Sequence, residues 1–582
     1  MGLSPEAASW ARVEDLAAQV KEVTSQRHLP LSLAPRRHGS SYHLTEKDYK
    51  RNATLLSLAG HDHVVRVDRE RRIIHAEAGV TMEALVRTAR EYGLVPKVVA
   101  PFRKATVGGA VSGSAASSSS HRHGSFHDSC NYLTVVLGNG SVVTCSKKDN
   151  AELFNSMAGS QGTLGLVALV GVECEEAAPT VRITYTRQAS VEEGLSALKH
   201  ACHYPTPPLS PQGGAEGGGG RPDFVDAVLF REKGKKVGEV APATQLTAEA
   251  IYDFSEVPLA TAVTAEEEQV GTRSHSFSEG AKLNEGGNLL PSPSFPPSLP
   301  PLYTGGRSPS DLFYSEHVND IHALLGKAGA DSYVERMDLE DYLFRFDRGV
   351  FWFAQSAAAS IATIPFLQGW LFPLASRSLF SRFCWRWLFT SSSLFSLLHA
   401  ATPDLLSSRL LLLAPSLPLS HAASFLPFLH TTLPLPPPAP LYLLPIRGAA
   451  VRQPFAPQGH IHTLFLSVLI HGRLTHGAAE GHTRRVEGWL GRKGGRKGLC
   501  AMNFYDKRMF WSGFPLYDWR EYLYLRGKYA ADGIFPSLEE KVCWEGQEGE
   551  RERGRKGGGE DGKGWVRRYL EGRRRKFVGI LL

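Results

Sequence analysis

The chain has 582 residues, of which 42% are hydrophobic, and this length predicts about three or four domains with a sizeable buried core. Its 65 basic and 58 acidic residues leave a net charge of +7, much of it in late runs such as GRKGGRKG. Because these runs lack interleaved aromatic side chains, nucleic-acid binding is not predicted. The seven cysteines form no C-x-x-C pair, which argues against a zinc or disulfide framework and favours a reducing compartment.

The sequence offers one candidate for a membrane span and no secretory signal. Residues 1–20 lack the basic and apolar segments of a signal peptide. Residues 410–446 contain no Asp, Glu, Lys or Arg over 37 positions, which is long enough to cross a bilayer, but they contain nine prolines. Because proline interrupts helices, we expect no continuous spanning helix there.

Residues 10–200 show the helix and strand signals of an α/β domain. The pattern predicts a helix over 11–27, a strand over 72–79, and a helix that Thr81 caps and Gly93 ends. It then predicts a β-hairpin turning at Gly140, a short helix over 150–159 and a buried strand over 164–175.

A run of small residues, TVGGAVSGSAASSSSHRHG, occupies positions 106–124. It has too little apolar surface to form a core, so it is either a linker or a backbone surface that a ligand approaches closely. Because it lies inside one compact domain, the ligand interpretation is favoured, and consecutive N–H groups there could bind a phosphate. GSQGTLG over 159–165 is a second candidate. A phosphate or dinucleotide site and a structural glycine-rich turn both remain open on the residues alone.

The G-x-G-x-x-G pattern of Rossmann domains occurs once, at Gly557, Gly559 and Gly562. It lies in a charged run with no preceding strand, so we do not interpret it as a dinucleotide site.

Several later stretches have a strongly biased composition. Residues 289–302 use only Leu, Pro, Ser and Phe, whose codons can consist of pyrimidines alone, and other runs use mainly Gly, Arg, Lys and Glu. We interpret these stretches as translated intron, with genuine low-complexity linker as the alternative. On either interpretation, residues 281–305, 360–499 and 545–582 are expected to have no compact fold, and proline should break any leucine-rich helix after a few turns.

Two segments between these stretches, 331–356 and 500–543, are rich in aromatic residues and in Arg and Asp. We expect them to pack on the first domain as parts of one cap and to border one pocket, with Phe351 and Trp511 on related faces.

The motifs ATVGGAVSGSAASSSSHRHG, VVLGNGSVV and LFNSMAGSQGTLGLV resemble the PCMH-type FAD-binding domain of the vanillyl-alcohol-oxidase superfamily. SSSHRHG, YLFRFDRGVFW and LRGKYAADGIFP resemble its Delta(24)-sterol reductase group. The resemblance implies an α+β fold, a two-lobed FAD-binding domain with an α/β substrate cap, here interrupted by low-complexity segments. The expected divisions are 1–200 for the FAD-binding domain, 201–356 for the start of the cap, 357–499 for the insert, 500–544 for the end of the cap and 545–582 for a charged tail.

The resemblance also implies site residues. Non-covalent FAD is expected at Thr106, Val107, Gly108, Gly109, Gly113, Ser117, Ser118, His121, Gly159, Gly162, Thr163 and Gly165. Pro35–Leu44 occupies the position of a first phosphate loop, with a basic surface turn as the alternative. The polar residues set among aromatic ones are the catalytic candidates, each with a structural role as the alternative: Tyr505, Asp506, Lys507, Arg345, Asp347 and Arg348. His121, His123 and His127 are expected to stabilise loops rather than to bind a metal.

The function that the resemblance implies is reduction of a side-chain double bond of a hydrophobic, sterol-like substrate, with NADPH as electron donor. A flavin oxidase or dehydrogenase acting on a hydroxy acid, sugar or lactone is one alternative, and an FAD-binding protein with a defective cap is another. The family implies association with the endoplasmic-reticulum membrane, peripheral in this chain, with a cytoplasmic protein as the alternative. The run SGSAASSSS departs from the family by its lack of a further glycine and an acidic residue, which leaves the sterol substrate open.

Overall fold

In the computed structural model, the part of the chain described here falls into fifteen segments, and every structural statement below concerns them alone. They are residues 4–25, 31–33, 54–203, 222–231, 243–253, 314–352, 390–400, 410–433, 440–458, 463–473, 478–499, 501, 503–505, 510–511 and 517–543. Pro35–Leu44, Asp506, Lys507 and the glycines at 557–562 lie outside them, as do the expectations for 281–305 and 545–582.

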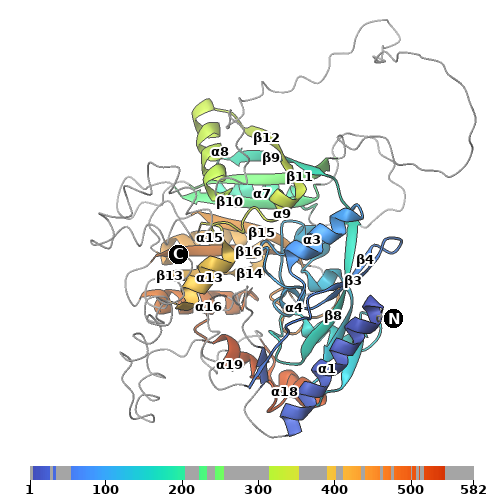
Figure 1. Cartoon of the computed structure of the whole chain (residues 1–582). Helices are drawn as coiled ribbons and strands as arrows, with labels where there is room; N and C mark the ends of the chain where they lie inside the picture. Colours follow the sequence, from blue (N-terminus) through green and yellow to red (C-terminus); the bar gives the residue numbers. More distant parts are fainter. Residues whose placement is uncertain are drawn as a thin grey trace, which may run out of the picture.

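A six-stranded sheet forms the centre of the first layer (Figure 1). Its strands are β3 (Val64–Asp68), β4 (Ile73–Glu77), β5 (Leu94–Pro96), β6 (Cys130–Val136), β7 (Val142–Ser146) and β8 (Leu166–Glu176). Their order is β3-β4-β8-β6-β7, with β5 on the end of β8. The predicted hairpin is confirmed, since β6 pairs antiparallel with β7 and Gly140 in the turn has a φ of 78°. A separate parallel pair joins β1 (Leu31–Leu33) to β2 (Thr54–Leu56).

Helices cover both faces of this sheet. The apolar stripe of α1 (Pro5–Ser25) packs on one face, while α3 (Met82–Glu91) and α4 (Val107–Ser112) pack on the other. Thr81 caps α3 as predicted, because its side chain accepts a hydrogen bond from the N–H of Ala84. Short segments complete the domain: α5 (Ser120–His123), the 3-10 helix η1 (His127–Ser129) and α6 (Ala151–Met157).

A nine-stranded antiparallel sheet forms the second layer. Its strands are β9 (Thr180–Gln188), β10 (Phe224–Arg231), β11 (Ala243–Asp253), β12 (Ser332–Asp338), β13 (Leu410–Leu413), β14 (Pro415–Pro418), β15 (Leu441–Arg447), β16 (Leu464–Arg473) and β17 (Arg496–Lys497). The order is β12-β9-β11-β10-β15-β16-β14-β17, and β13 pairs with β16. β9 therefore joins the cap sheet, although the sequence placed all of 1–200 in the first domain.

One face of the cap sheet is covered by α7 (Val191–Ala201), α15 (Ala422–Thr432) and α16 (Ala478–Arg492), which share a buried apolar cluster with it. The other face points toward the first layer and shares the buried apolar cluster of that layer. α8 (Tyr314–Ala328) and α9 (Leu339–Leu343) also contribute to this second cluster. The cap sheet therefore contacts apolar side chains on both faces.

The expectation that 360–499 lacks a compact fold is wrong for its described part. Leu411, Leu413 and Leu443 are fully buried between the sheet and α15 or α16. A strand that is buried on both faces has a continuous apolar sequence instead of an alternating one. The biased composition therefore looked like a low-complexity sequence. Its leucine side chains nevertheless pack as the buried core of the cap sheet.

Proline does not interrupt these elements as expected. Pro427 lies inside α15, whose neighbouring residues Phe425, Leu426 and Leu429 are all buried. Pro445 lies in β15, two residues beyond Leu443, the last residue of β15 that pairs with β10. A strand position without a partner on one side tolerates proline, because no N–H is needed there.

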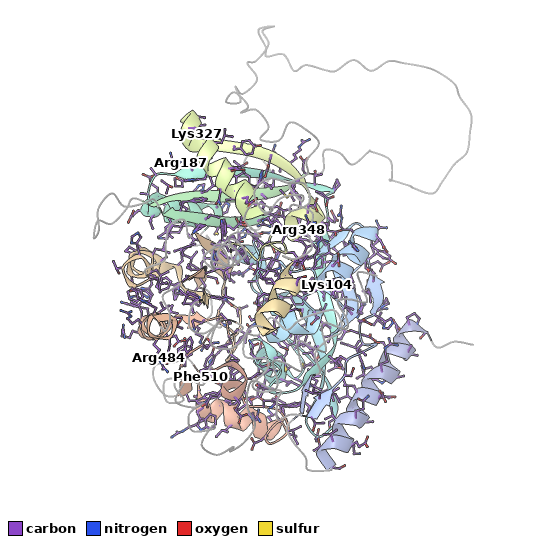
Figure 2. All side chains as sticks on the ribbon, turned by 60° about the vertical axis from the view of Figure 1, so that its left-hand side comes forward. Lys104, Arg187, Lys327, Arg348, Arg484 and Phe510 are labelled. Atoms are coloured by element: carbon purple, nitrogen blue, oxygen red, sulfur yellow. The ribbon has the colours of Figure 1, made fainter. Side chains whose placement is uncertain are left out.

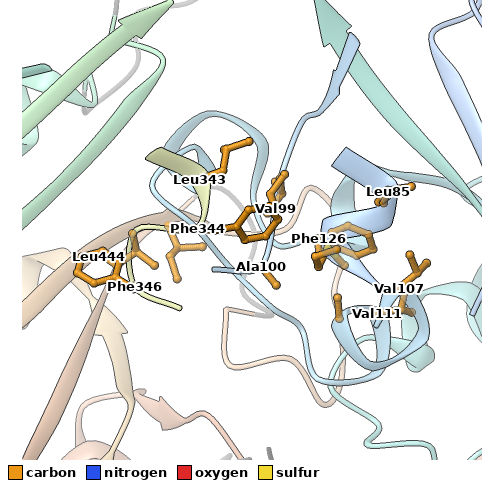
Figure 3. Close-up of a cluster of buried hydrophobic side chains, with 14 of the residues drawn as sticks. Leu85, Val99, Ala100, Val107, Val111, Phe126, Leu343, Phe344, Phe346 and Leu444 are labelled. Atoms are coloured by element: carbon orange, nitrogen blue, oxygen red, sulfur yellow. The ribbon is translucent and has the colours of Figure 1, made fainter. Parts of the chain in front are cut away.

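Residues Leu343–Phe346 connect the two layers. Figure 3 shows Phe344 beside Val99 of the FAD domain, and Phe346 beside Leu444 of β15. α13 (Ser391–Ala400) lies next to this connection, while α18 (Trp519–Lys528) and α19 (Leu538–Val542) lie at the end of the molecule near α1 (Figure 1). The described parts of 331–356 and 500–543 both contribute to the buried cluster of the first layer, as predicted. That they border one pocket stays a prediction.

Across the described segments, no helix combines the length and the hydrophobicity that a bilayer crossing requires.

Candidate active site between the FAD domain and the cap

The first half of the glycine–serine run is a helix, not an open loop of amides. Thr106 caps α4 by accepting a hydrogen bond from the N–H of Gly109 at 3.1 Å. The N–H of Val107 donates to Val80 O at 2.9 Å, and that of Gly108 donates to Ala78 O at 2.8 Å. The N–H of Gly113 donates to Gly109 O. Each of these four backbone N–H groups therefore already has an internal acceptor, and the predicted approach of these residues to FAD stays a prediction.

Gly108 instead permits close packing between α4 and the end of β4. A Cβ atom at position 108 would lie 2.7 Å from the Cβ of Ala78 and 3.2 Å from its carbonyl oxygen. The side chain of Val107 is fully buried in the same cluster. Both residues help to fix the position of the run against the first sheet.

The second half of the run, 114–119, offers the free groups that a cofactor could use. The hydroxyl of Ser114 is buried and has no hydrogen-bond partner in the described part of the chain. No acceptor is found there for the N–H groups of Ala116, Ser118 and Ser119. Unpaired N–H groups and a hydroxyl are suitable donors for the phosphates of FAD. The donor set of 114–119 therefore fits that cofactor, and of the predicted residues it retains Ser118.

Ser117 has a structural role in this half of the run. Its N–H donates to Ser120 Oγ at 3.0 Å, and its hydroxyl pairs with Ser119 Oγ at 3.0 Å. His121 lies beside it, with Nδ1 2.9 Å from Ser118 O and Nε2 3.2 Å from Pro222 O. His121 thereby connects the run to the segment that enters β10.

The second predicted segment, 159–165, lies against the first. The N–H of Gln161 donates to Ser112 O at 3.0 Å, which joins the two glycine-containing segments. A Cβ at Gly159 would lie 2.3 Å from Phe455 O, and one at Gly165 would lie 2.6 Å from the side chain of Val135. These two glycines allow close backbone packing.

Gly162 and Thr163 complete that segment. Gly162 has a φ of 71°, a conformation that favours glycine. The hydroxyl of Thr163 donates a hydrogen bond to Ser160 O. The backbone carbonyl of Thr163 accepts a hydrogen bond from the Arg526 guanidinium at 3.0 Å. None of these contacts requires a cofactor, so a role of 159–165 in FAD binding stays a prediction.

A buried polar network lies where the run meets the cap. Arg345 pairs with Asp226 of β10, and both side chains are almost fully buried. The Arg345 guanidinium also donates to Ser118 Oγ at 3.3 Å and to Tyr342 O at 2.7 Å. The hydroxyl of Tyr442 in β15 donates to Asp226 Oδ2 at 3.1 Å. Three distant parts of the sequence therefore meet at one carboxylate.

Burial and the adjacent guanidinium act in opposite directions on the Asp226 carboxyl. Loss of solvation raises the pKa of Asp226, and the adjacent Arg345 guanidinium opposes that rise. The guanidinium lies over the ring of Tyr342, 3.9 Å from its centroid. Burial also raises the pKa of Tyr442 well above its usual range, so that hydroxyl stays protonated.

The other two candidates near Arg345 have structural contacts. Asp347 accepts hydrogen bonds from the N–H of Arg103 at 2.9 Å and from the hydroxyl of Ser391 at 2.6 Å, which tie the connecting segment to the FAD domain and to α13. Arg348 is half-buried and forms a β-bridge with Thr390.

Tyr505 and Arg345 have different neighbours. Figure 2 labels Phe510 below Arg348. The ring centroid of Tyr505 lies 5.2 Å from Lys497 Nζ, which pairs with Glu487, and no contact among the described residues joins it to Arg345. Asp506 and Lys507 lie outside the described residues, so a site shared by the two groups of catalytic candidates stays a prediction. Lys497 itself is buried in β17, although the sequence placed it in an unfolded charged run.

Two site residues, Asp226 and Tyr442, were missed from the sequence. Asp226 is the one acidic residue within the apolar strand sequence FVDAVLF, and that interruption was the available signal. Tyr442 lies in the proline- and leucine-rich stretch that was interpreted as low complexity, so no candidate residue was sought there.

In the described part of the chain, no three His, Cys, Asp or Glu side chains are placed to hold a metal ion. His127 instead contacts Phe154 O through Nε2 at 2.8 Å.

Comparison with known proteins agrees with this architecture. Residues 8–146 match the FAD binding domain family. The chain is 22% identical to the Delta(24)-sterol reductase of Homo sapiens over 539 residues, which covers 91% of this chain and 86% of that protein. It is 28% identical to that of Pisum sativum over 186 residues, 31% of this chain and 32% of that protein. It is also 29% identical to cytokinin dehydrogenase 9 of Oryza sativa subsp. japonica over 173 residues, 29% of this chain and 33% of that protein.

The alignment with the human protein extends through the cap as well as the FAD domain. This agrees with the packed strands in the described part of 410–499, and the intron interpretation stays a hypothesis. The chain therefore has a PCMH-type FAD-binding domain followed by a cap, and it is similar to Delta(24)-sterol reductases over most of its length.

Proposed function

We propose that this chain, whose FAD-binding domain places it among FAD-dependent oxidoreductases, reduces a side-chain double bond of a sterol-like substrate with NADPH as electron donor. The observation that carries the proposal is the buried Arg345–Asp226–Tyr442 network, which lies between the donor groups of 114–119 and the aromatic side of the cap sheet. Similarity to Delta(24)-sterol reductases supports the choice of substrate.

Reduction of an isolated double bond requires a hydride on one carbon and a proton on the other. FAD held by the donor groups of 114–119 would supply the hydride chemistry, with NADPH as the source of the electrons. The protein has to supply the proton. We assign Asp226 as the acid, because burial raises the pKa of its carboxyl. Arg345 and Tyr442 both donate to Oδ2, so Oδ1 is the oxygen that would hold the proton.

The walls around this acid suit an apolar substrate. Phe346, Phe351 and Tyr442 are buried, with ring centroids 4.2 to 4.9 Å apart. Such a surface excludes water, and the cation beside it, Arg345, is already paired with Asp226 rather than open to a small acidic substrate. An apolar, ring-containing substrate therefore matches it better than a hydroxy acid or a sugar.

The test is anaerobic reduction of the purified FAD-loaded protein by NADPH, followed by addition of desmosterol. We expect the visible absorption of the flavin to bleach with NADPH and to return when desmosterol is added, with one reduced sterol formed per flavin reoxidised. Asp226→Asn should still be reduced by NADPH but should reoxidise at least about 100-fold more slowly with the sterol. A wild-type protein whose reduced flavin does not react with desmosterol would contradict the proposal.

A flavin dehydrogenase acting on another substrate is the second candidate, and the similarity to cytokinin dehydrogenase 9 over the FAD domain favours it. In that case, the oxidised flavin would be bleached by a substrate without NADPH. The third candidate, a protein with a defective cap, loses its motivation because the described part of 360–499 is packed into the cap sheet.

The proposed function implies one partner, a sterol-like small molecule, and it requires no binding of nucleic acid. We further propose peripheral association with the endoplasmic-reticulum membrane, which rests on the similarity to sterol reductases. Fractionation of cells that express the tagged chain tests this point. Recovery in the soluble fraction alone would favour a cytoplasmic protein.

A further inference from the structure

His471 faces the FAD-domain side of the cap sheet. In β16, Leu466, Val468 and Ile470 belong to the cluster under α15 and α16, whereas Phe465 and Leu469 belong to or pack against the cluster of the FAD domain. Because side chains alternate along a strand, His471 lies on the same side as Leu469. Tyr442 of the proton-donating network pairs directly with Leu469 in the neighbouring strand, so it lies on this side too.

The ring of His471 is buried without a polar partner. Its side chain belongs to a residue that is 1% exposed, yet neither Nδ1 nor Nε2 has a hydrogen-bond partner in the described part of the chain. His127, also buried, shows the usual arrangement, with Nε2 2.8 Å from Phe154 O. An unpaired buried polar group costs about 1–3 kcal/mol, which a phenylalanine of similar shape would avoid. Two such atoms on one ring require an explanation, and a bound polar group is one that would satisfy both.

An aromatic surface connects His471 to the acid. The ring of Trp352 is stacked on His471, with centroids 6.1 Å apart and planes 8° apart. Phe346 lies 6.3 Å from Trp352 and 4.9 Å from Tyr442, whose hydroxyl donates to Asp226. His471 therefore stands at one end of a buried aromatic surface, and Asp226 stands at the other.

The chemistry of the ring selects the partner. Burial lowers the pKa of His471 to about 3, so the imidazole is neutral at physiological pH. A neutral imidazole has one donor and one acceptor nitrogen, which matches the single donor and the lone pairs of an alcohol. A carboxylate or phosphate would instead require a cation at that position.

We propose that His471 hydrogen-bonds a hydroxyl group at the end of the substrate remote from the reacting double bond. The proposal rests on the proposed function and adds to it the substrate class, an apolar alkene that has an alcohol at its far end. The role of His471 is to bind and orient; it takes no part in the transfer of hydride or proton.

The test compares desmosterol with its 3-deoxy analogue, both as equilibrium ligands of the oxidised FAD-loaded protein and as substrates. Wild type should prefer the hydroxylated sterol by about 10- to 100-fold in affinity and in kcat/KM, mainly through KM. His471→Phe should lose this preference by weakening desmosterol alone. His471→Gln, which keeps a donor and an acceptor, should restore part of it. Ile470→Val, on the opposite side of β16, is the matched control and should keep the preference.

Three outcomes separate the possibilities. Equal affinity of wild type for the two sterols overturns the role of His471 without any variant being made. A preference that His471→Phe retains, with FAD content and reduction by NADPH unchanged, also overturns it. Failure of wild type to bind or reduce either sterol removes the proposed function itself, and the role of His471 with it.

Discussion

At the scale of single residues, the site depends on which polar atoms are already paired. The N–H groups of Val107, Gly108 and Gly109 point to internal acceptors, while those of Ala116 and Ser118 have none in the described part of the chain. Sequence composition treats all glycines and serines of the run alike. Only the second half has backbone N–H groups without an acceptor in the described part of the chain.

Gly108 provides a test at this scale. Gly108→Val should lower the free energy of unfolding by about 1–3 kcal/mol, because its Cβ would lie 2.7 Å from the Cβ of Ala78 and the helix has to shift. The measurement is urea unfolding followed by circular dichroism. Gly109→Ala is the matched control, since its Cβ would meet only the side-chain oxygen of Thr106, at 3.0 Å. Equal losses for the two variants would show that close packing against Ala78 is not the cause.

At the scale of elements, the cap sheet is built largely from segments with an unusual composition. β13, β14 and β15 are rich in leucine and proline, yet each pairs with a neighbour in the sheet. Leucine can pack in strands when both faces are covered, because burial there outweighs its weaker intrinsic preference for strands. β15 is the element that positions Tyr442 beside Asp226.

Leu443 tests whether this part of the chain is folded in solution. Leu443→Ala should cost about 2–5 kcal/mol of the free energy of unfolding, because the side chain is fully buried between the sheet and its covering helices. Leu412→Ala, at a half-buried position in β13, should cost less. Urea midpoints of the two variants and of wild type give the comparison. If both substitutions have no effect, β13 and β15 are not part of a cooperative core.

At the scale of the whole molecule, the FAD domain and the cap share one buried cluster. That cluster contains Val107 and Phe126 of the FAD domain, Phe344 of the connecting segment, and Leu444 of β15 (Figure 3). The two layers are therefore expected to unfold together. A cofactor bound at their junction should stabilise both.

FAD binding should consequently raise the melting temperature of the whole chain. At an FAD concentration about 100-fold above Kd, the added stability should be about 2.7 kcal/mol in a single transition. Differential scanning calorimetry of the FAD-stripped protein, with and without FAD, is the measurement, and adenosine added alone is the control ligand. Two transitions, of which only one moves, would show that the layers are not coupled. The absence of any shift would contradict FAD binding by this chain.

The sequence alone predicted the local elements of the FAD domain, because their signals are local. The cap on α3, the turn at Gly140 and the buried strand β8 each depend on a few neighbouring residues. It also indicated the FAD-binding domain through its small-residue motifs, and it singled out Arg345. Tertiary structure decided the rest: which amides of the run stay free, and that Asp226 and Tyr442, 216 positions apart, meet at Arg345. It also decided that the leucine- and proline-rich stretch is a strand buried on both faces. Such contacts depend on register and on packing between distant segments, which no local pattern of residues records.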